Sequence, residues 1–392
     1  MRSKPAKIQR KLKICILMDM IRAARRDKLS GILKYESLFG PFQLWVPNLE
    51  DFSLEKHSFT DCDGIIVDRA LGDLAEEALR ELSQPTVILD YQGKIEQLPA
   101  SCCGIVETDN EADGLMGAEF FLERRFQHFG FVNENPRVLY SEIRQTAFEA
   151  RLKQEGFSCE VYSVSKTAKT PASDLERLKR WLKKIPKPAG ILCASDSRAH
   201  QALQACAQAG ISVPQEVAML GIDDDASVCQ LCSPPLSSIV NDNQQGGYLA
   251  AELLIKRLSN PQSQPGFSQL RYPPKYIHQR KSTATYVNAA QFVQEALDFI
   301  ELNNGIGISV DDVSKRVHVS RRRLEVSFRR ATGKTVLEQI HEIRFNRICK
   351  LLRETTLKVS EIAQLCGYQS EFYIYSAFKR RMGMTILQYR RK

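Results

Sequence analysis

The chain has 392 residues, too many for one ordinary domain and enough for two or three. Its net charge of +9 is concentrated near one end, because residues 287–392 hold 19 Lys and Arg against 11 Asp and Glu, whereas the first 286 residues hold 36 against 35. A basic module attached to a near-neutral one is typical of proteins that bind a polyanion through one of their parts.

The cysteines and apolar runs exclude the secreted and membrane classes. Most of the 11 cysteines, such as Cys15, Cys193 and Cys206, lie inside apolar segments. The first apolar run is too short for a signal peptide, and no stretch approaches the roughly 20 apolar residues that span a bilayer. We therefore expect a cytoplasmic protein with reduced thiols and no membrane contact. Cys229-x-x-Cys232 is the one spacing that fits zinc or redox chemistry, but no second pair or nearby histidine accompanies it, so we expect no metal and no cofactor.

The first part of the chain predicts a basic tail followed by an α/β domain. Residues 1–13 carry six Lys and Arg, and from residue 14 to 283 short apolar runs alternate with helical stretches. Strands are predicted at 14–19, 43–46, 64–68, 86–90, 104–108, 129–133, 159–164, 191–194, 218–222 and 237–240. Helices are predicted at 110–125, 139–155, 173–184, 197–208 and 244–258. This alternation indicates parallel βαβ units, and some 270 residues exceed one core, so we expect two lobes with a cleft between them.

The last part of the chain predicts an all-α domain. A turn-rich loop at 259–268 and a linker at 284–290 precede residues 291–392. Within them, a short helix at 310–317, the turn His318-Val319 and a basic helix at 320–330 form a helix-turn-helix unit, and Gly333 stops the second helix. Apolar residues at helical spacing then predict one long helix over 336–353.

A second helix-turn-helix unit follows. Ser360 is the predicted N-cap of its first helix, and Gly367 supplies the turn. The second helix begins near Ser370 and stops at Gly383. Its predicted inner face holds Phe372, Tyr375 and Phe378, and it closes with Lys379, Arg380 and Arg381. Two such units in tandem, each ending in cations, favour insertion of helices into a DNA major groove over a plain helical bundle.

Residues 292–391 resemble the DNA-binding domain of the AraC/XylS transcription regulators. The residues that carry the resemblance are Ser320, Leu324, Phe328, Ile362, Ala363, Gly367, Tyr368, Phe378, Lys379, Gly383, Thr385, Tyr389 and Arg390. The chain departs from the family at Ile386, where Pro is usual, and at Ile374, where Phe is usual. Both changes replace one apolar residue by another, so we expect them to alter packing and not function.

The α/β part resembles the effector domain of LacI-type repressors and the periplasmic sugar-binding proteins. The segments 192–199, 210–214, 221–225 and 235–239 carry this resemblance in order. LacI-type regulators place their helix-turn-helix before the sensor, whereas only about 13 residues precede the first strand here. The two resemblances together imply a two-lobed sensor of periplasmic-binding-protein type followed by a tandem helix-turn-helix domain of AraC type.

Polar residues that follow predicted strands are candidates for holding a ligand. Open α/β folds bind ligands at the carboxyl ends of their strands, and Asp196, Asp223 and Asn241 each follow one. The resemblance implies that these three residues and Arg144 hold a sugar by its ring oxygen and hydroxyls. Asp19, at the end of the first strand, fits by position. For Asp196, the alternative role of helix N-cap stays open.

The opening residues of each recognition helix are candidates for base contacts. We expect these contacts from Ser320, Arg321, Arg322, Glu325, Gln369, Ser370, Glu371 and Tyr373. We expect phosphate contacts from Arg323, Arg330, Lys379, Arg380 and Arg381. Arginine bonded to guanine is the commonest specific contact, which favours Arg321 and Arg322. A rigid connecting helix sets the two units about 34 Å apart, in successive major grooves.

Together these features predict a sugar-responsive transcription regulator that binds double-stranded DNA as a homodimer and acts with RNA polymerase. The resemblance implies an activator of pentose genes, with xylose as the favoured effector. A regulator that senses another monosaccharide is the first alternative, and a sugar-binding or sugar-modifying protein with a helical assembly tail is the second. An enzyme is not expected, because the chain lacks the G-x-S-x-G, H-E-x-x-H and G-x-G-x-x-G motifs, and Phe328 stands where a phosphate loop needs glycine.

Overall fold

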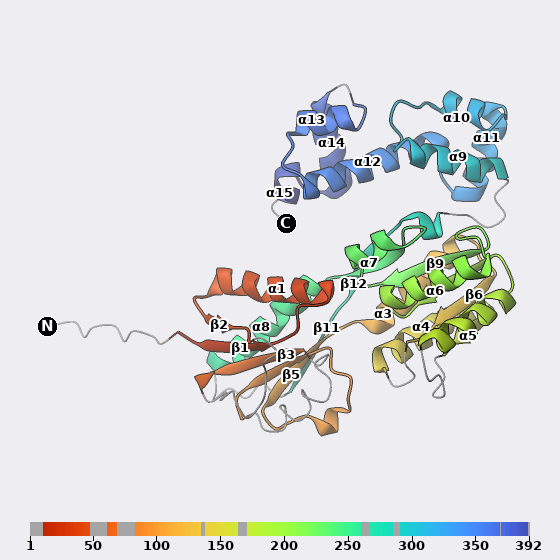
Figure 1. Ribbon diagram of the computed structural model, residues 1–392. Coiled ribbons are helices and arrows are strands. Elements are labelled where there is room, and N and C mark those ends of the chain that lie inside the picture. Colours follow the sequence, from red (N-terminus) through yellow and green to blue (C-terminus); the bar gives the residue numbers. More distant parts are fainter. Residues whose placement is uncertain are drawn as a thin grey trace. The chain divides into compact units, whose positions relative to one another are not determined.

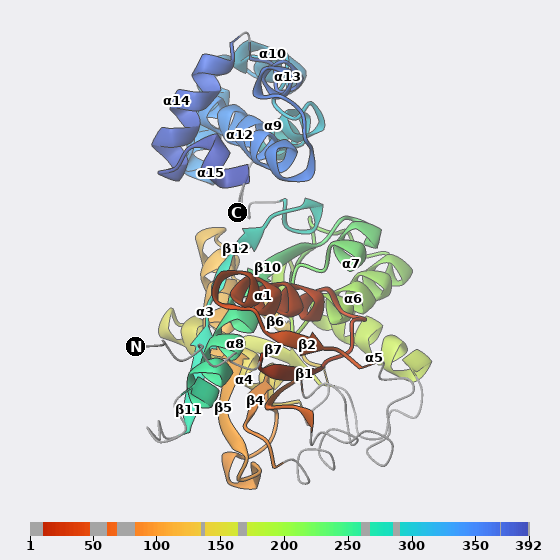
Figure 2. The same ribbon diagram turned by 90° about the vertical axis from the view of Figure 1, so that its left-hand side faces the viewer.

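The computed structural model consists of two six-stranded sheets with their covering helices, followed in the chain by a set of helices alone (Figures 1 and 2). The structure describes residues 11–47, 61–68, 83–134, 138–163, 171–259, 267–284, 291–368 and 370–390. The chain divides between Thr283 and Ala284 into an α/β unit and a helical unit. In the described ranges, no helix is both long and apolar enough to cross a bilayer.

The first lobe of the α/β unit is a parallel sheet with the order β11-β5-β4-β3-β1-β2. Its strands are β1 (Lys13–Leu17), β2 (Gln43–Trp45), β3 (Gly64–Asp68), β4 (Thr86–Leu89), β5 (Cys102–Thr108) and β11 (Ser268–Tyr272). The inner strands are continuous apolar runs because helices and loops cover both of their faces. The short helix η3 (Ile95–Gln97) lies between β4 and β5.

Two helices of this lobe, α1 (Ala23–Phe39) and α8 (Asn243–Ser259), pack backbone against backbone. A Cβ atom on Gly31 would lie 1.9 Å from the carbonyl oxygen of Gln244, and one on Gly247 would lie 1.8 Å from that of Lys28. Only glycine allows this approach. It holds α1 against α8 at the place where the Lys28 side chain enters the lobe.

The second lobe is a sheet with the order β12-β10-β9-β8-β6-β7. Its strands are β6 (His128–Val132), β7 (Cys159–Tyr162), β8 (Ala189–Cys193), β9 (Val217–Ile222), β10 (Ser237–Asn241) and β12 (Pro274–His278), with β12 antiparallel to β10. Its helices are α3 (Asn110–Glu123), α4 (Leu139–Gln154), α5 (Pro171–Lys184), α6 (Asp196–Ala209) and α7 (Ala226–Leu231), and the short η4 (Lys281–Thr283) follows β12. The chain crosses between lobes after β5, β10 and β11, so three connections join them.

The helical unit contains two small cores that share one long helix. Its helices are α9 (Gln291–Leu302), α10 (Val310–Arg316), α11 (Arg321–Thr332), α12 (Val336–Glu354), α13 (Val359–Leu365), α14 (Glu371–Met382) and α15 (Ile386–Arg390). Ile340 of α12 packs in the first core with Leu324 and Phe328, and Ile348 of α12 packs in the second with Ile362 and Phe378. The predicted fold class, a two-lobed α/β sensor followed by tandem helix-turn-helix units, is confirmed.

The turns of the two helix-turn-helix units use the same backbone conformation with different residues. Gly367 has φ +74°, and His318 takes the equivalent left-handed place at φ 53°. Gly333 and Gly383 end α11 and α14 in the same conformation. Ser309 and Asp312 form a capping box at the start of α10.

Several expectations about elements were wrong or incomplete. The N-cap of α13 is Lys358 and not Ser360, because the Glu361 carboxylate accepts the Lys358 N–H at 2.6 Å and starts the helix earlier. The segments 23–39, 226–231, 291–302 and 386–390 form helices that the apolar pattern did not predict, and β11 and β12 are additional strands. Residues 260–266 of the predicted loop, residues 285–290 of the predicted linker, and all but the last three residues of the predicted tail lie outside the described ranges.

The predicted inner face of α14 is confirmed at Phe378 and was wrong at Phe372 and Tyr375. Phe372 and Tyr375 are 78% and 45% exposed, whereas Ile374 and Phe378 are buried. The ring centroid of Phe378 lies 5.5 Å from that of Phe345 on α12 and 5.0 Å from that of Tyr389 on α15. Because α14 packs on both helices, the spacing of four residues from 374 to 378 decides its rotation.

Candidate ligand site and DNA-reading helices

Arg144 on α4 is the centre of a buried polar cluster in the second lobe. Its Nη2 atom lies 2.9 Å from Asp113 Oδ2 and 3.8 Å from Asp223 Oδ1. Its Nε donates to Asn110 Oδ1 at 2.9 Å, and its Nη1 donates to the carbonyl oxygen of Ala194 at 2.6 Å. The guanidinium is therefore held on three sides while its side chain stays only 5% exposed.

Two buried oxygens in this cluster accept no hydrogen bond within the described ranges. Asn241, the last residue of β10, donates through Nδ2 to Asp113 Oδ2 at 3.4 Å. The Oδ1 atoms of Asn241 and Asp113 are both buried and without a donor there. A buried unsatisfied acceptor costs about 1–3 kcal/mol. Hydroxyl donors of a bound ligand would remove that cost.

Burial dominates the electrostatics of the two carboxylates. It raises the pKa of Asp113 to about 6, although the charge of Arg144 acts to lower it. Burial likewise raises the pKa of Asp223 to about 6 against the opposing charge of Arg144. At neutral pH the cluster therefore carries two carboxylates against one guanidinium. This balance disfavours phosphorylated or acidic ligands and suits a neutral molecule with several hydroxyl groups.

Asp223 is held in an unusual backbone conformation directly after β9. Its φ is 113°, a region that residues other than glycine rarely adopt. The Asp223 N–H donates to the carbonyl oxygen of Ile239 at 3.0 Å, which fixes the backbone. The Asp223 side chain keeps 31% of its surface exposed, whereas the Asp113 side chain is 0% exposed. A ligand can therefore reach this carboxylate directly.

Asp196 has donors on both of its carboxylate oxygens. Its Oδ1 accepts from Ser238 Oγ at 2.5 Å, and its Oδ2 accepts from the Asp225 N–H at 2.7 Å and from Cys229 Sγ at 3.3 Å. It is not the N-cap of α6, because that role belongs to Ser195. Burial, followed by the charge of Asp223, raises the pKa of Asp196 well above its usual range. The carboxyl therefore fixes the loop that carries Asp223.

Asp19 belongs to a second charged cluster, in the first lobe. Its carboxylate pairs with Arg25, and its Oδ1 accepts the Ile21 N–H at 3.0 Å. Lys28 lies on α1, the helix that also carries Arg25. Its side chain is 3% exposed, and its Nζ is 3.3 Å from Asp68 Oδ2. The Lys28 ammonium also pairs with Asp90.

Asp90 links the first lobe to the Arg144 cluster electrostatically. It follows β4, and its Oδ1 accepts the Thr108 N–H at 3.0 Å. Burial is the largest single influence and acts to raise the pKa of Asp90. The charge and hydrogen bond of Lys28, the hydrogen bond from Thr108 and the charge of Arg144 together outweigh it, so the pKa is lowered. The Asp90 side chain is 30% exposed. Nearby, the Tyr140 N–H donates to Gln92 Oε1 at 3.0 Å, which is a direct bond between lobes.

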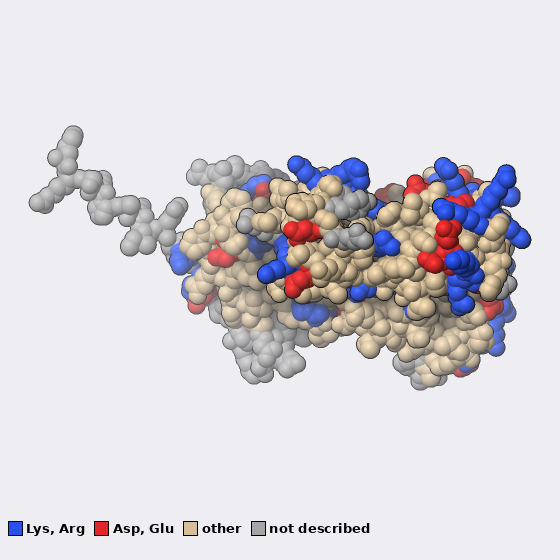
Figure 3. Space-filling model, turned by 90° about the horizontal axis from the view of Figure 1, so that it is seen from above, with Lys and Arg blue, Asp and Glu red and all other residues tan. Residues whose placement is uncertain are grey.

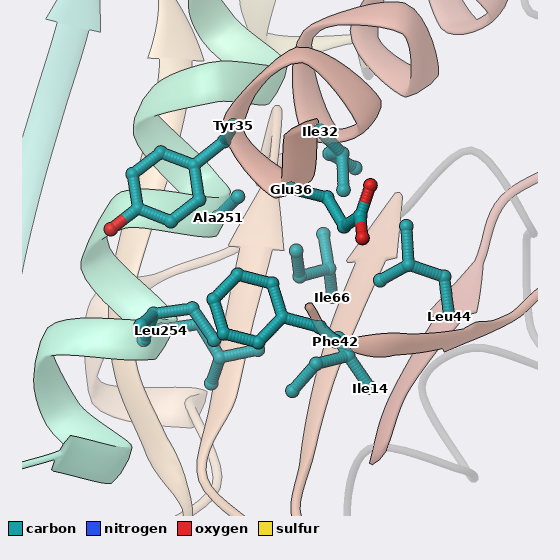
Figure 4. A pocket seen from close by; sticks show the side chains of 10 residues that line it. Ile14, Ile32, Tyr35, Glu36, Phe42, Leu44, Ile66, Ala251 and Leu254 are labelled. Atoms are coloured by element: carbon teal, nitrogen blue, oxygen red, sulfur yellow. The ribbon is translucent and has the colours of Figure 1, made fainter. Parts of the chain in front are cut away.

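An apolar pocket lies elsewhere in the first lobe, between α1, α8 and β2 (Figure 4). It is lined by Ile14, Ile32, Tyr35, Glu36, Phe42, Leu44, Ile66, Ala251, Leu254 and Ile255, and its cavity volume is only about 10 Å³. Sites for small molecules typically occupy about 300–1,000 Å³ and place several polar groups against the ligand. This pocket has neither property, so it is not a site for a polyol.

The first recognition helix, α11, presents one arginine more freely than its neighbours. Arg321 pairs with Asp311 at 3.2 Å, and the guanidinium of Arg323 lies 5.3 Å from the ring centroid of Phe292. Arg322 is exposed and makes no ion pair within the described ranges. Ser320 caps the helix by accepting the Arg323 N–H. Figure 3 shows Lys and Arg gathered over the end of the helical unit that carries α10 and α11, with acidic side chains among them.

Two other residues predicted on α11 differ in where they point. Glu325 is partly buried, and its Oε2 accepts the Val336 N–H at 3.4 Å, so it turns toward α12 and away from a groove. Arg330 is exposed near the end of α11.

The second recognition helix, α14, differs in its chemistry. Ser370 caps it by accepting the Phe372 N–H at 3.3 Å, and Glu371 is partly buried. Lys379, Arg380 and Arg381 are all exposed, but the Arg381 guanidinium lies 4.6 Å from the ring centroid of Phe345 and 3.9 Å from Glu342 Oε1. Of the other predicted residues, Gln369 and the side chain of Tyr373 lie outside the described part of the chain.

Comparison with known proteins agrees with this arrangement. Residues 118–283 match the model of the periplasmic binding protein-like domain, and residues 313–392 match that of a helix-turn-helix domain. The chain is 30% identical over 387 residues to the xylose operon regulatory protein of Escherichia coli, and the alignment covers 96% of both chains. The chain belongs to the family of xylose operon regulatory proteins. It is a DNA-binding transcription regulator with a ligand-sensing domain.

Further similarities extend over the full length of this regulator. It is 29% identical over 384 residues to the xylose operon regulatory protein of Haemophilus influenzae, covering 96% of this chain and 98% of the relative. The solved structure of the xylose-binding transcription activator XylR superposes with a TM-score of 0.63 at 28% identity, covering 97% of this chain and 98% of that one. The predicted order, sensor before helix-turn-helix units, is confirmed.

The cysteine pair of the regulator takes part in the loop behind the ligand cluster. Cys229 on α7 donates to Asp196, and Cys232 lies 3.3 Å from His200 Nδ1. Burial raises the pKa of the Cys229 thiol, and it raises that of Cys232 to about 11. Both effects disfavour the thiolate that a zinc ion or a disulfide exchange requires.

Sequence reasoning missed two residues of the regulator's candidate site. Asp90 carried a usable signal, because the predicted strand 86–90 ends in this aspartate as other strands end in Asp223 or Asn241. Asp113 carried no such signal, because it lies inside the helical pattern of α3, where an acidic residue is expected on the solvent-exposed face. Only the three-dimensional fold brings it to Arg144.

Proposed function

We propose that the regulator activates pentose-utilisation genes when a neutral monosaccharide, xylose before others, binds at the Arg144 cluster. Arg144, Asp223 and Asn241 hold the sugar, together with Asp113 and Asp90. Asp196 and Asp19 act through their neighbours, as positioning residues. The observation that carries the proposal is the pair of buried acceptors on Asp113 and Asn241, which adjoin a fixed guanidinium and need hydroxyl donors. The names of the full-length relatives support xylose.

We also propose where the regulator works and what it binds besides the sugar. The regulator works in the cytoplasm as a homodimer on operator DNA, acts with RNA polymerase and catalyses no reaction. Base contacts come chiefly from Arg322, and from Arg321 once it exchanges Asp311 for DNA. Phosphate contacts come from Arg330, Lys379 and Arg380. The proposed linker at residues 284–290 joins the sensor to this reading surface.

A ligand screen tests the sensor proposal. The full chain is heated with D-xylose, L-arabinose, D-ribose, D-glucose or D-galactose, and the unfolding of the sensor is followed. A sugar at 100 times its dissociation constant stabilises the unit by about 2.7 kcal/mol. We expect D-xylose to give the largest shift and D-xylose 5-phosphate to give none, because the cluster carries excess negative charge.

Two variants on the same helix sharpen the test. Arg144→Met removes the central cation, and we expect the sugar-induced shift to be lost. Arg151→Met removes an arginine that pairs with Glu119 and Glu155 on the outside of α4, so its sugar response should match the parent's. A stable Arg144→Met protein that still binds sugar with the parent's affinity would show that the site lies elsewhere. A larger shift with another sugar would replace xylose and leave the site in place.

A further inference from the structure

The rotation of α14 places an aromatic side chain on its outer face. Ile374 and Phe378 are 1% and 0% exposed and fasten α14 to its neighbours. This packing forces Phe372, the second residue of the helix, outward, where it is 78% exposed. Tyr375, one turn further along, is 45% exposed. An apolar strip therefore lies along the N-terminal half of the helix, on the side opposite its core.

The surroundings of this strip indicate what covers it. Lys379 and Arg380 follow at i+7 and i+8 from Phe372, near the same side of α14, and both are exposed. The strip lies within residues 313–392, which match a helix-turn-helix domain, and it opens the helix that such a domain inserts into the major groove. Cations beside an apolar strip complement a DNA groove, in which phosphates flank base edges.

The major groove offers one apolar group on its base edges, the C5-methyl of thymine. An exposed phenyl ring at the start of a recognition helix matches that group in chemistry and position. The start of α11 instead presents Arg321 and Arg322, which suit guanine. We propose that Phe372 is a specificity-determining residue that selects thymine through its methyl group, with Tyr375 beside it. This inference rests on the proposed function of α14 as a DNA-reading helix.

A chemical substitution in the DNA isolates the contact. Binding sites are selected from random duplexes with the full-length parent, and each thymine of the half-site bound by the second unit is then replaced by uracil. Uracil keeps every hydrogen-bonding group and lacks only the methyl. We expect one or two positions at which the parent loses about fourfold in affinity, the value of burying one methyl-sized group. Phe372→Ala should bind the thymine duplex with a similar loss and show no further loss with uracil.

Two controls accompany this measurement. Leu387→Ala removes a 64% exposed apolar side chain from α15, outside the reading helix, and should leave the uracil penalty unchanged. Phe372→Leu keeps an apolar contact and should retain part of the penalty. Because Phe372 is exposed, its substitution should not alter the melting of the helical unit.

The outcomes separate this inference from the function on which it rests. Phe372 does not read thymine if the parent selects sequences but uracil has no effect in the half-site bound by the second unit. The same conclusion follows if Phe372→Ala loses as much affinity on replacement of thymine by uracil as the parent does. If Phe372→Ala instead weakens self-association of the chain without changing the uracil penalty, the strip is a protein contact and the proposal is overturned. If the parent selects no sequence at all, the assignment of α14 as a reading helix is wrong.

Discussion

The carboxyl group of Asp113 should make the stability of the α/β unit depend on pH. Asp113 is fully buried, and burial raises its pKa from 3.8 to about 6 despite the attraction of Arg144. A group with a raised folded-state pKa binds its proton more tightly in the native chain than in the unfolded one. The stability that it contributes is fully present below pH 3.8 and is lost as the pH rises through 6.

The size of the effect follows from these pKa values. The difference of about 2 pKa units corresponds to about 3 kcal/mol of unfolding free energy. By the linkage relation, about 1.3 kcal/mol of this is lost between pH 5 and pH 7. Asp113→Asn keeps the shape and cannot ionise. We therefore expect the parent to lose about 1.3 kcal/mol relative to this variant over that range.

Urea unfolding followed by tryptophan fluorescence measures this difference in the α/β unit alone. Both tryptophans of the chain, Trp45 on β2 and Trp181 on α5, lie in that unit. Glu119→Gln, on the exposed side of the same helix as Asp113, should show the parent's pH dependence. If Asp113→Asn and the parent change in parallel from pH 5 to 7, the carboxyl does not ionise in the buried position described.

Other consequences concern the sugar, the packing and the DNA. Calorimetry should show sugar affinity falling below pH 6, because protonated Asp113 and Asp223 accept fewer hydrogen bonds; a constant affinity would contradict their role. Gly247→Ala should lower the urea midpoint by the equivalent of about 1–3 kcal/mol or more, because its methyl meets a backbone oxygen. Arg322→Ala should cost about 1–3 kcal/mol and relax base preference in a site selection, unless α11 contacts only phosphates. In salt titrations, Arg380→Ala should flatten the slope more than Arg381→Ala.

Sequence pattern predicted the sensor fold because its signals are local. The buried strands of parallel sheets are continuous apolar runs, and polar residues after β9 and β10 mark the edge at which ligands bind. Helix α1 was not predicted because its inward face includes Arg25 and Lys28, and these charged residues interrupt the helical spacing of apolar residues. Those charges are buried only because Asp68 and Asp90, from strands far along the chain, meet them.

The candidate site was predicted in part for a related reason. Strand ends identified Asp223 and Asn241, and the resemblance supplied Arg144. Whether a carboxylate faces a ligand or its own loop depends on donors that sequence does not place. Ser238 and Cys229 turn Asp196 toward the loop, whereas Asp113 on a helix faces Arg144. A strand-end rule can find the edge of the sheet but not the direction of each side chain on it.

The same limit applies to counting cations in the reading helices. Of the basic residues predicted to contact DNA, Arg321, Arg323 and Arg381 already have a partner in their own unit, at Asp311, at the Phe292 ring and at the Phe345 ring. The exposed Arg321–Asp311 ion pair is worth about 0–1 kcal/mol, so DNA can displace it, but the released Asp311 carboxylate then repels phosphate. Each phosphate neutralised on B-DNA contributes a salt slope of about −0.9. The three cations proposed to contact phosphate, Arg330, Lys379 and Arg380, therefore account for a slope of about −2.7 per chain, whereas all five predicted phosphate contacts would give about −4.5.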